Sequence, residues 1–179
     1  MLIYLIGEPG VGKSTVLAAY WKLTATRNES QATDKIPHTK HFNDETYLGL
    51  EIGNPKPKNE LHPGTDTLSY GIMPKATEWI QTRTDPLIIA EGDRLAHPKF
   101  WEASERSGRK VLLIHVTGPT HTRRVNRGTE QNENWLRSRA TRVKNLADNY
   151  PHTHLNTIKL TPEEAAQSLN EIINRRKSR

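Results

Sequence analysis

The sequence predicts an α/β fold class, a three-layer α/β/α sandwich around a mostly parallel five-stranded sheet with a small β-hairpin excursion. Three short runs, at 2–6, 86–90 and 111–116, are almost continuously apolar, as are strands buried on both faces of a parallel sheet. Segments with helical periodicity separate these runs. Strands joined by right-handed crossovers through helices lie parallel to one another. The alternation therefore predicts one sheet with helices on both of its faces.

The first half of the chain supplies the first helix and the hairpin. The helix is expected over 13–26, directly after the first apolar run. Two segments, 35–42 and 46–52, flank an Asn-Asp pair at 43–44, which is typical of a hairpin turn. Residues 53–64 hold three prolines and two glycines, so they are expected to form a loop.

The second half supplies the remaining helices and the last strand. Pro98 is expected to start a helix that Gly108 ends. Asn134 is expected to cap a longer helix, and Thr161, followed by Pro162, to open the terminal one. A strand is predicted at 154–160. Helices are predicted at 74–83, 98–108, 119–126, 134–150 and from 162 onward.

The composition indicates a single cytoplasmic domain. The chain has 179 residues, of which 34% are hydrophobic, and no cysteine. One domain is expected over 1–179, with 35–64 as the hairpin and loop excursion and 119–144 as an arginine-rich lid region. The lack of cysteine is typical of a reducing compartment, and no apolar stretch approaches the roughly 20 residues of a membrane helix. No membrane partner is therefore expected, and the oligomeric state stays open.

The charge balance suggests a partner. The net charge is +6 and the isoelectric point is about 9.6. An excess of positive charge over the whole chain favours a polyanionic partner such as nucleic acid. The alternative is charge that serves solubility, combined with a site that handles phosphate.

A glycine-rich loop carries the most specific chemical signal. Residues 7–14 read Gly-Glu-Pro-Gly-Val-Gly-Lys-Ser and match G-x-x-x-x-G-K-[ST] in full, between a predicted strand and a predicted helix. Glycines allow successive N–H groups to turn toward phosphate oxygens. Lys13 is expected to reach the β- and γ-phosphates, and Ser14 to join a Mg²⁺ shell. The expected contacts with a nucleoside triphosphate come from Gly7, Glu8, Pro9, Gly10, Val11, Gly12, Lys13, Ser14 and Thr15.

Charged residues follow the second apolar run, where 91–94 reads Glu-Gly-Asp-Arg. Ligands of open parallel sheets bind beyond the carboxyl ends of the strands. Glu91 and Asp93 are therefore candidates for holding Mg²⁺ or for accepting a proton from an attacking hydroxyl. Arg94 is a candidate for binding the phosphate of an acceptor. The alternative is an ordinary polar loop after a strand.

The third strand end leads into a basic region. From 121 to 144 the chain has seven Lys or Arg residues against two acids. Arg123, Arg124 and Arg127 are expected on a closing lid, where arginines stabilise the charge of a transferring phosphoryl group. Arg139 is a further candidate for contact with the substrate. The alternative is a solvated basic helix face.

The segment after the proline-rich loop is rich in hydroxyl groups around one carboxylate. Asp66 is a helix cap or turn residue, or the general base for the acceptor, or a residue that holds the sugar of the acceptor. Ser69 is a candidate substrate contact. Tyr70, Trp79 and Trp101 either stack on a nucleobase or belong to the core. The eight histidines show no ligand pattern, so no metal site is expected from them.

The chain resembles the P-loop kinase superfamily, nearest to its thymidylate-kinase-like and polynucleotide-kinase-like branches. Thymidylate kinases have an Asp-Arg pair after the corresponding strand, which the resemblance assigns to Asp93 and Arg94. The superfamily implies a P-loop NTP hydrolase fold with ATP and Mg²⁺ as cofactors. The segments that carry the resemblance are 7–15, 91–94, 123–127 and 157–173.

A narrower resemblance is to small kinases encoded by tailed bacteriophages, which implies a location in the host cytoplasm. One set of phage kinases in the thymidylate kinase family phosphorylates hydroxymethyluracil bases in DNA, a step in base modification. The hairpin and proline-rich region at 35–64 departs from thymidylate kinases, which argues against free dTMP as the acceptor. The segments that look like the phage kinases are 64–69, 91–95, 131–132 and 135–136.

The leading hypothesis is an ATP-dependent kinase of the 5-hydroxymethyluracil DNA kinase type. The alternatives are a small-molecule nucleoside or nucleoside monophosphate kinase, and an ATPase switch or motor acting on a partner. An arginine-rich lid in the same chain favours a kinase, because switches usually take an arginine in trans. The expected residues are Lys13, Asp66, Asp93, Arg123 and Arg127 for catalysis, Arg124 for the nucleotide, Ser14, Glu91 and Asp93 for the metal, and Asp66, Ser69, Arg94 and Arg139 for the substrate.

Overall fold

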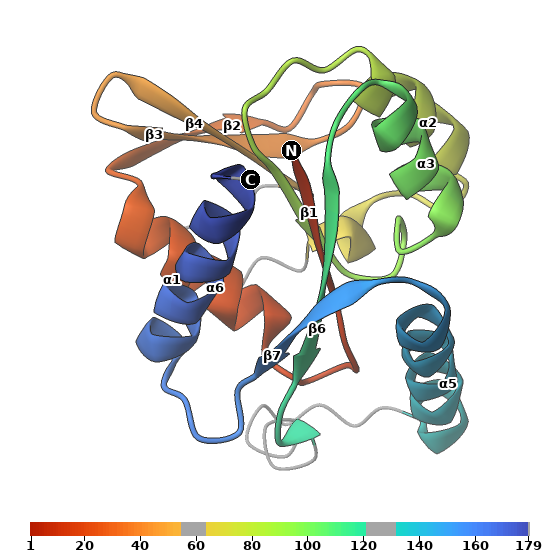
Figure 1. The fold of residues 1–179 in the computed structure, drawn as a ribbon. Helices are drawn as coiled ribbons and strands as arrows, with labels where there is room; N and C mark the ends of the chain where they lie inside the picture. Colours follow the sequence, from red (N-terminus) through yellow and green to blue (C-terminus); the bar gives the residue numbers. More distant parts are fainter. Residues whose placement is uncertain (55–63, 121–131, 179) are drawn as a thin grey trace. The chain divides into compact units, whose positions relative to one another are not determined.

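The computed structural model describes residues 1–54, 64–120 and 132–178 (Figure 1). The chain divides into two compact units. The first unit comprises Met1–Leu5 and Thr24–Leu112, and the second comprises Ile6–Leu23 and Leu113–Arg179. Two strands, β1 (Leu2–Ile6) and β6 (Val111–Thr117), begin in the first unit and end in the second. Within the described residues, no helix is both long and apolar enough to cross a membrane.

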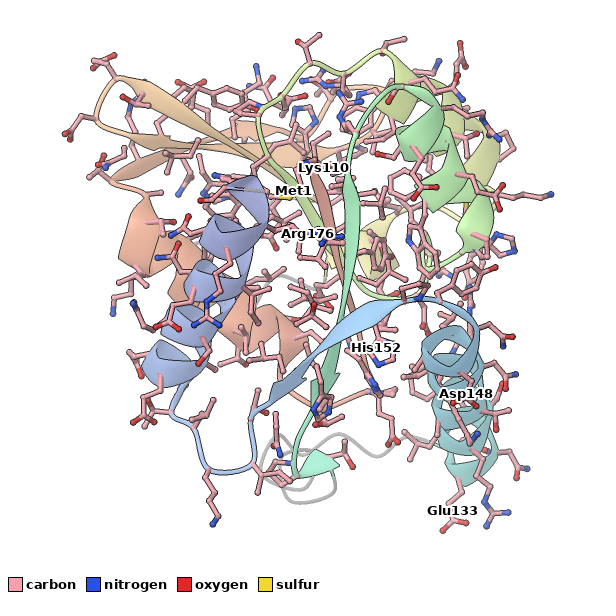
Figure 2. The ribbon with its side chains drawn as sticks, in the orientation of Figure 1. Met1, Lys110, Glu133, Asp148, His152 and Arg176 are labelled. Carbon is pink, nitrogen blue, oxygen red and sulfur yellow. The ribbon has the colours of Figure 1, made fainter. Side chains whose placement is uncertain are left out.

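The sheet of the first unit combines a meander with parallel strands. The two pairs β2–β3 and β3–β4 are antiparallel, whereas β4–β5 and β5–β1 are parallel. The register of the last pair sets Leu5 opposite Glu91. On the other side of β1, the Leu2 N–H donates to the Lys110 carbonyl oxygen at 2.9 Å, close to the labelled Met1 and Lys110 in Figure 2. The order of strands is β2 (Arg27–Gln31), β3 (His38–Asn43), β4 (Thr46–Ile52), β5 (Ile88–Glu91) and β1.

Three helical segments accompany this sheet: the short 3₁₀ helix η1 (Gly64–Thr67), α2 (Met73–Gln81) and α3 (Pro98–Arg106). The α2 and α3 helices lie side by side (Figure 1). Pro98 occupies the first turn of α3, where its missing N–H leaves no bond unmade, and the His97 side chain caps the helix by accepting from the Lys99 N–H at 3.1 Å. The buried faces of α2 and α3 include Ile80 and Phe100, both without solvent exposure.

The second unit contains the helices α1 (Lys13–Thr24, its last residue in the first unit), α5 (Glu133–Asn149) and α6 (Pro162–Lys177). Its two strands, β6 and β7 (His152–Asn156), pair in parallel. Thr161 and Glu164 form a reciprocal capping box at the start of α6. The buried residues of α6 recur at helical spacing, at Ala165, Ala166, Leu169 and Ile173.

The predicted fold class is confirmed, since the strands pair mostly in parallel and are accompanied by helices. Seven strands are found among the described residues, where five were predicted in the sheet. The hairpin at 35–52 is confirmed, but it belongs to the sheet, because β4 pairs with β5. The edge strand β2 was not predicted, since its residues are polar and mostly exposed.

Two further predictions concern helix starts. The prediction that Asn134 caps α5 is wrong: the cap is Asn132, whose side chain accepts from the N–H groups of Asn134 and Trp135. Both residues are good caps, and the choice between them depends on where the backbone enters the helix. Most of the helix predicted at 119–126 lies outside the described residues.

A buried carboxylate ties the hairpin to the segment before β5. The Asp85 side chain is 5% exposed, and it accepts from Arg83 Nε at 2.7 Å, from Arg83 Nη2 at 3.0 Å and from the Tyr47 hydroxyl. Burial by itself raises the pKa of Asp85, but the hydrogen bonds from Arg83 and Tyr47 outweigh it, so the pKa lies below its ordinary value. The ionised form is therefore the one that stabilises the fold.

We expect Asp85→Asn to lower the free energy of unfolding by about 1–3 kcal/mol at pH 7. Because the folded pKa of Asp85 is lowered, its contribution is complete above the ordinary carboxyl pKa of about 4 and is lost as the pH falls through the folded pKa. Urea unfolding of both proteins at pH 7 and at pH 3.5 measures this loss. Asp148→Asn, an exposed carboxylate on α5, serves as the control and should change stability by less than about 0.5 kcal/mol. A difference between wild type and Asp85→Asn that grows on acidification would contradict the assignment.

Candidate functional site

The predicted phosphate loop connects β1 to α1. The loop residues Gly10 and Gly12 have φ angles of 84° and 102°, which residues with a Cβ rarely adopt. The helix α1 begins at Lys13, directly after the second of these glycines. A glycine-shaped loop that leads straight into a helix N-terminus is the backbone arrangement that binds phosphate.

The first glycine of the loop allows a close approach to β6. A Cβ on Gly7 would lie 2.5 Å from the Val116 carbonyl oxygen and 3.0 Å from Val11 Cγ1. The distance to the Val116 carbonyl oxygen is shorter than a carbon atom tolerates, so no larger residue fits at position 7 without movement of the strand. Glycine at this position is therefore required by packing.

The Lys13 ammonium folds back over the loop. It donates to the Gly7 carbonyl at 2.8 Å and to the Glu8 carbonyl at 3.2 Å. A lysine ammonium has three donors, so these two bonds hold it in place with one donor beyond them. The remaining predicted contacts lie in the same segment: Val11 is buried, and Glu8, Pro9, Ser14 and Thr15 are half-buried.

A second group of predicted residues meets in the first unit, at the end of β5. Glu91 is the last residue of β5, and Asp66 belongs to η1. The Asp93 N–H donates to Asp66 Oδ1 at 2.6 Å. Gly92 between the carboxylates has φ 102°, and a Cβ on it would lie 3.0 Å from Asp66 Cγ. The structure therefore brings Asp66, Glu91 and Asp93 together.

Glu91 is the most enclosed of these carboxylates, with 3% of the residue exposed. A Cβ on Gly64 would lie 2.4 Å from the Glu91 carbonyl oxygen and 2.7 Å from Glu91 Oε1. The first residue of η1 thus packs directly against this side chain. By contrast, Asp93 is half-buried and Asp66 is exposed.

Arg94 reaches the segment that follows η1. Its Nε donates to the Leu68 carbonyl at 3.2 Å, and its guanidinium lies 3.5 Å from the centre of the Tyr70 ring. Tyr70 is 86% exposed, and Ser69 beside it is also exposed. The alternative that Trp79 and Trp101 belong to the core is confirmed, since both are less than 5% exposed.

The sequence did not predict that Tyr4 joins this group. Its hydroxyl donates to the Gly92 carbonyl at 2.8 Å and lies 3.3 Å from Thr65 Oγ1. Burial raises the pKa of Tyr4 well above its ordinary value, and the negative charges of Asp66, Glu91 and Asp93 raise it further. The only signal in the sequence is a tyrosine within the otherwise aliphatic strand β1.

Some of the basic residues of α5 form ion pairs with acidic residues of the same helix. Arg137 pairs with Glu133 at 3.3 Å and Lys144 with Asp148 at 2.5 Å, and the two acids lie at opposite ends of α5 (Figure 2). The Arg139 guanidinium lies 5.2 Å from the centre of the Trp135 ring. Arg123, Arg124 and Arg127, the predicted lid arginines, lie outside the described residues.

The site residues thus form two groups that belong to different units, residues 7–15 in one and Asp66, Glu91, Asp93 and Arg94 in the other. Within the described residues, no cluster of three or more His, Cys, Asp or Glu side chains is arranged to hold a metal ion alone. Mg²⁺ in nucleotide sites takes one or two protein oxygens, and phosphates and waters complete its shell. The half-buried Ser14 hydroxyl and the carboxylates at the end of β5 are donors of this kind.

Comparison with known protein families gives a match that covers nearly the whole chain. The family model described as P-loop Nucleotide Kinase3 matches residues 1–172, which is nearly the whole chain. No curated protein matches the chain.

We expect Gly92→Ala to lower the free energy of unfolding by at least about 1 kcal/mol more than Gly108→Ala does. The difference is the cost of the steric clash that only the Cβ at position 92 makes. Both glycines have positive φ angles and therefore share the backbone penalty of about 1–2 kcal/mol. Only Gly92 has neighbours that a Cβ would meet, at 3.0 Å from Asp66 Cγ and from Thr65 Oγ1, whereas Gly108 has none within 4 Å. Urea unfolding of the two variants measures the difference. Equal losses would mean that the close packing around Gly92 carries no energy.

Proposed function

The chain belongs to the P-loop Nucleotide Kinase3 family, and from this membership we propose that it is an ATP-dependent phosphotransferase that acts on a nucleotide or a nucleic acid. The observation that carries the proposal is the loop at 7–14, with Gly10 and Gly12 at positive φ and Lys13 held over the loop at the start of α1. Family and loop together support ATP as the phosphate donor.

The loop is the donor half of the proposed site. The N-terminus of α1 and the loop N–H groups bind the phosphates, and the Lys13 ammonium neutralises charge on the β- and γ-phosphates. We propose that Ser14 and Glu91 hold Mg²⁺. Asp93, which the sequence also predicts as a metal ligand, is the alternative to Glu91. When bound, Mg²⁺ neutralises phosphate charge that builds up during transfer. Arg124 and the catalytic arginines Arg123 and Arg127 are proposed to act on the same phosphates.

The carboxylate group at the end of β5 is the acceptor half. An acceptor hydroxyl attacks the γ-phosphorus, a new oxygen–phosphorus bond forms, the bond to the β-phosphate oxygen breaks, and ADP leaves. Asp93 is proposed to take the hydroxyl proton, because it is half-buried and lies two residues after the end of β5. Arg94 and Ser69, together with Arg139, are proposed to bind the acceptor.

The preferred acceptor is the hydroxymethyl group of a modified pyrimidine in DNA. The net charge of +6 and the seven Lys or Arg residues in 121–144 support a polyanionic acceptor. A small nucleoside or nucleoside monophosphate is the second candidate. It is favoured by the exposed Tyr70 and the Arg94 guanidinium on its ring, since an aromatic side chain and a cation can bind a base and a phosphate.

We expect Lys13→Ala to lower kcat for phosphate transfer by at least about a hundredfold, because the variant loses the cation that stabilises the transferring group. Lys22→Ala is the matched control, since Lys22 is an exposed lysine in the last turn of the same helix. The measurement is transfer of labelled γ-phosphate from ATP, with circular dichroism to show that both variants are folded. Activity that survives in Lys13→Ala would contradict the proposed donor half.

The acceptor is identified by offering wild-type protein a panel of deoxynucleoside monophosphates, nucleosides, plain DNA and hydroxymethyluracil DNA. The proposal predicts label in the modified DNA alone, with an affinity whose logarithm falls steeply with the logarithm of the salt concentration. Labelled monophosphates with a salt-insensitive KM would instead support the small-molecule kinase. ATP hydrolysis at one rate with every acceptor and with none would count against both kinases and favour the ATPase switch or motor.

A further inference from the structure

The peptide bond between Gly92 and Asp93 is hydrogen-bonded at both of its polar atoms. Its carbonyl oxygen accepts from the Tyr4 hydroxyl at 2.8 Å, and its N–H donates to Asp66 Oδ1 at 2.6 Å. The C=O and N–H groups of a planar trans peptide point in opposite directions, so the two bonds grip the plane from both sides. Rotation of this peptide would break both bonds at once.

The hydrogen bond to the carbonyl oxygen comes from a side chain that is held rigidly in the core. Tyr4 is fully buried, and its ring packs edge-on against Trp101 and Phe100, with centroids at 5.9 and 6.4 Å. Its backbone is paired with Ala90 in the register of β1 and β5. Burial raises the pKa of the hydroxyl well above its ordinary value, so the proton that makes the bond to Gly92 stays in place at neutral pH.

The hydrogen bond from the Asp93 N–H depends on a close approach of Asp66 to the backbone. The Asp66 carboxylate lies next to the Gly92 backbone, where a Cβ would sit 3.0 Å from Asp66 Cγ and 3.1 Å from Asp66 Oδ1. The positive φ of Gly92 and the missing side chain therefore allow the carboxylate to reach the next N–H. Asp66 Oδ1 thus accepts from the backbone N–H of Asp93, as the side chain of a capping residue does.

We infer that Tyr4 and Asp66 are positioning residues that clamp the Gly92–Asp93 peptide and thereby aim the Asp93 carboxylate. The inference rests on the proposed function, in which Asp93 takes the proton of the acceptor. The gripped peptide joins Gly92 directly to the Cα of Asp93, so its orientation sets the direction in which that side chain leaves the backbone. Misplacement of a catalytic group by about 1 Å costs up to a hundredfold in rate.

The two Asp66 variants separate a clamp from a base. The Asp66→Asn variant retains an oxygen that accepts from the Asp93 N–H but cannot take a proton at neutral pH, whereas Asp66→Ala loses the acceptor altogether. We expect kcat to fall by less than about threefold in Asp66→Asn and by at least about tenfold in Asp66→Ala, with the KM for ATP unchanged in both. If Asp66→Asn is as inactive as Asp66→Ala, Asp66 is a base and the inference is wrong.

Tyr4→Phe removes the other half of the clamp and leaves the buried ring in place. We expect kcat to fall about tenfold with an unchanged KM for ATP. Tyr47→Phe is the matched control: it also loses one tyrosine hydrogen bond in the first unit, to Asp85, and should lower the thermal midpoint without changing kcat. A kcat for Tyr4→Phe equal to that of the control would overturn the inference.

Asp93→Asn distinguishes failure of this inference from failure of the proposed function. If Asp93→Asn loses at least about a hundredfold in kcat while Tyr4→Phe and Asp66→Ala keep wild-type rates, Asp93 acts without the clamp and only the inference fails. If Asp93→Asn keeps wild-type activity, Asp93 is not the base, and the proposed acceptor half and the inference fail together. The double variant Tyr4→Phe/Asp66→Ala should lose less than the product of the two single losses, because both act on one peptide.

Discussion

The parallel pairing of two buried strands is the constraint on which the rest of this structure depends. Every residue of β1 and β5 is buried, and their register sets Leu5 opposite Glu91. Each Å² of apolar surface that is removed from water stabilises the fold by about 25 cal/mol. This burial is the main stabilising contribution to a domain of this size. The phosphate loop follows β1 and Glu91 ends β5, so both candidate groups begin at fully buried strands.

Backbone conformations that only glycine adopts readily recur at these strand ends. Gly10 and Gly12 shape the phosphate loop, and Gly92 lets a carboxylate approach the backbone after β5. Residues without a side chain add nothing to the hydrophobic core, and they lose more conformational entropy on folding than other residues. Their presence at these positions reflects the geometry of the site, and the neighbouring strands supply the stability that offsets the cost.

Much of the fold could be predicted, because its signals are local. Apolar runs predicted β1, β5 and β6, and Thr161 with Pro162 predicted the start of α6. Predictions were wrong or incomplete where two nearby residues are equally good helix caps, or where a strand forms only because a neighbouring strand pairs with it. Asn132 and not Asn134 caps α5, and the polar edge strand β2 exists because β3 offers it hydrogen-bonding partners.

The same division holds for the candidate site. The sequence alone determined the phosphate loop, because the spacing of its glycines, Lys13 and Ser14 is itself the requirement for binding phosphate. It left Asp66 as either a cap or a base, and it gave no reason to connect Tyr4 with Asp93. Only the tertiary structure decided that Tyr4, Asp66 and the Gly92–Asp93 peptide meet, since residues 26 to 89 positions apart in the chain come together through strand pairing and the packing of η1. Hydrogen bonds act over about 3 Å in space, and sequence separation does not encode that distance.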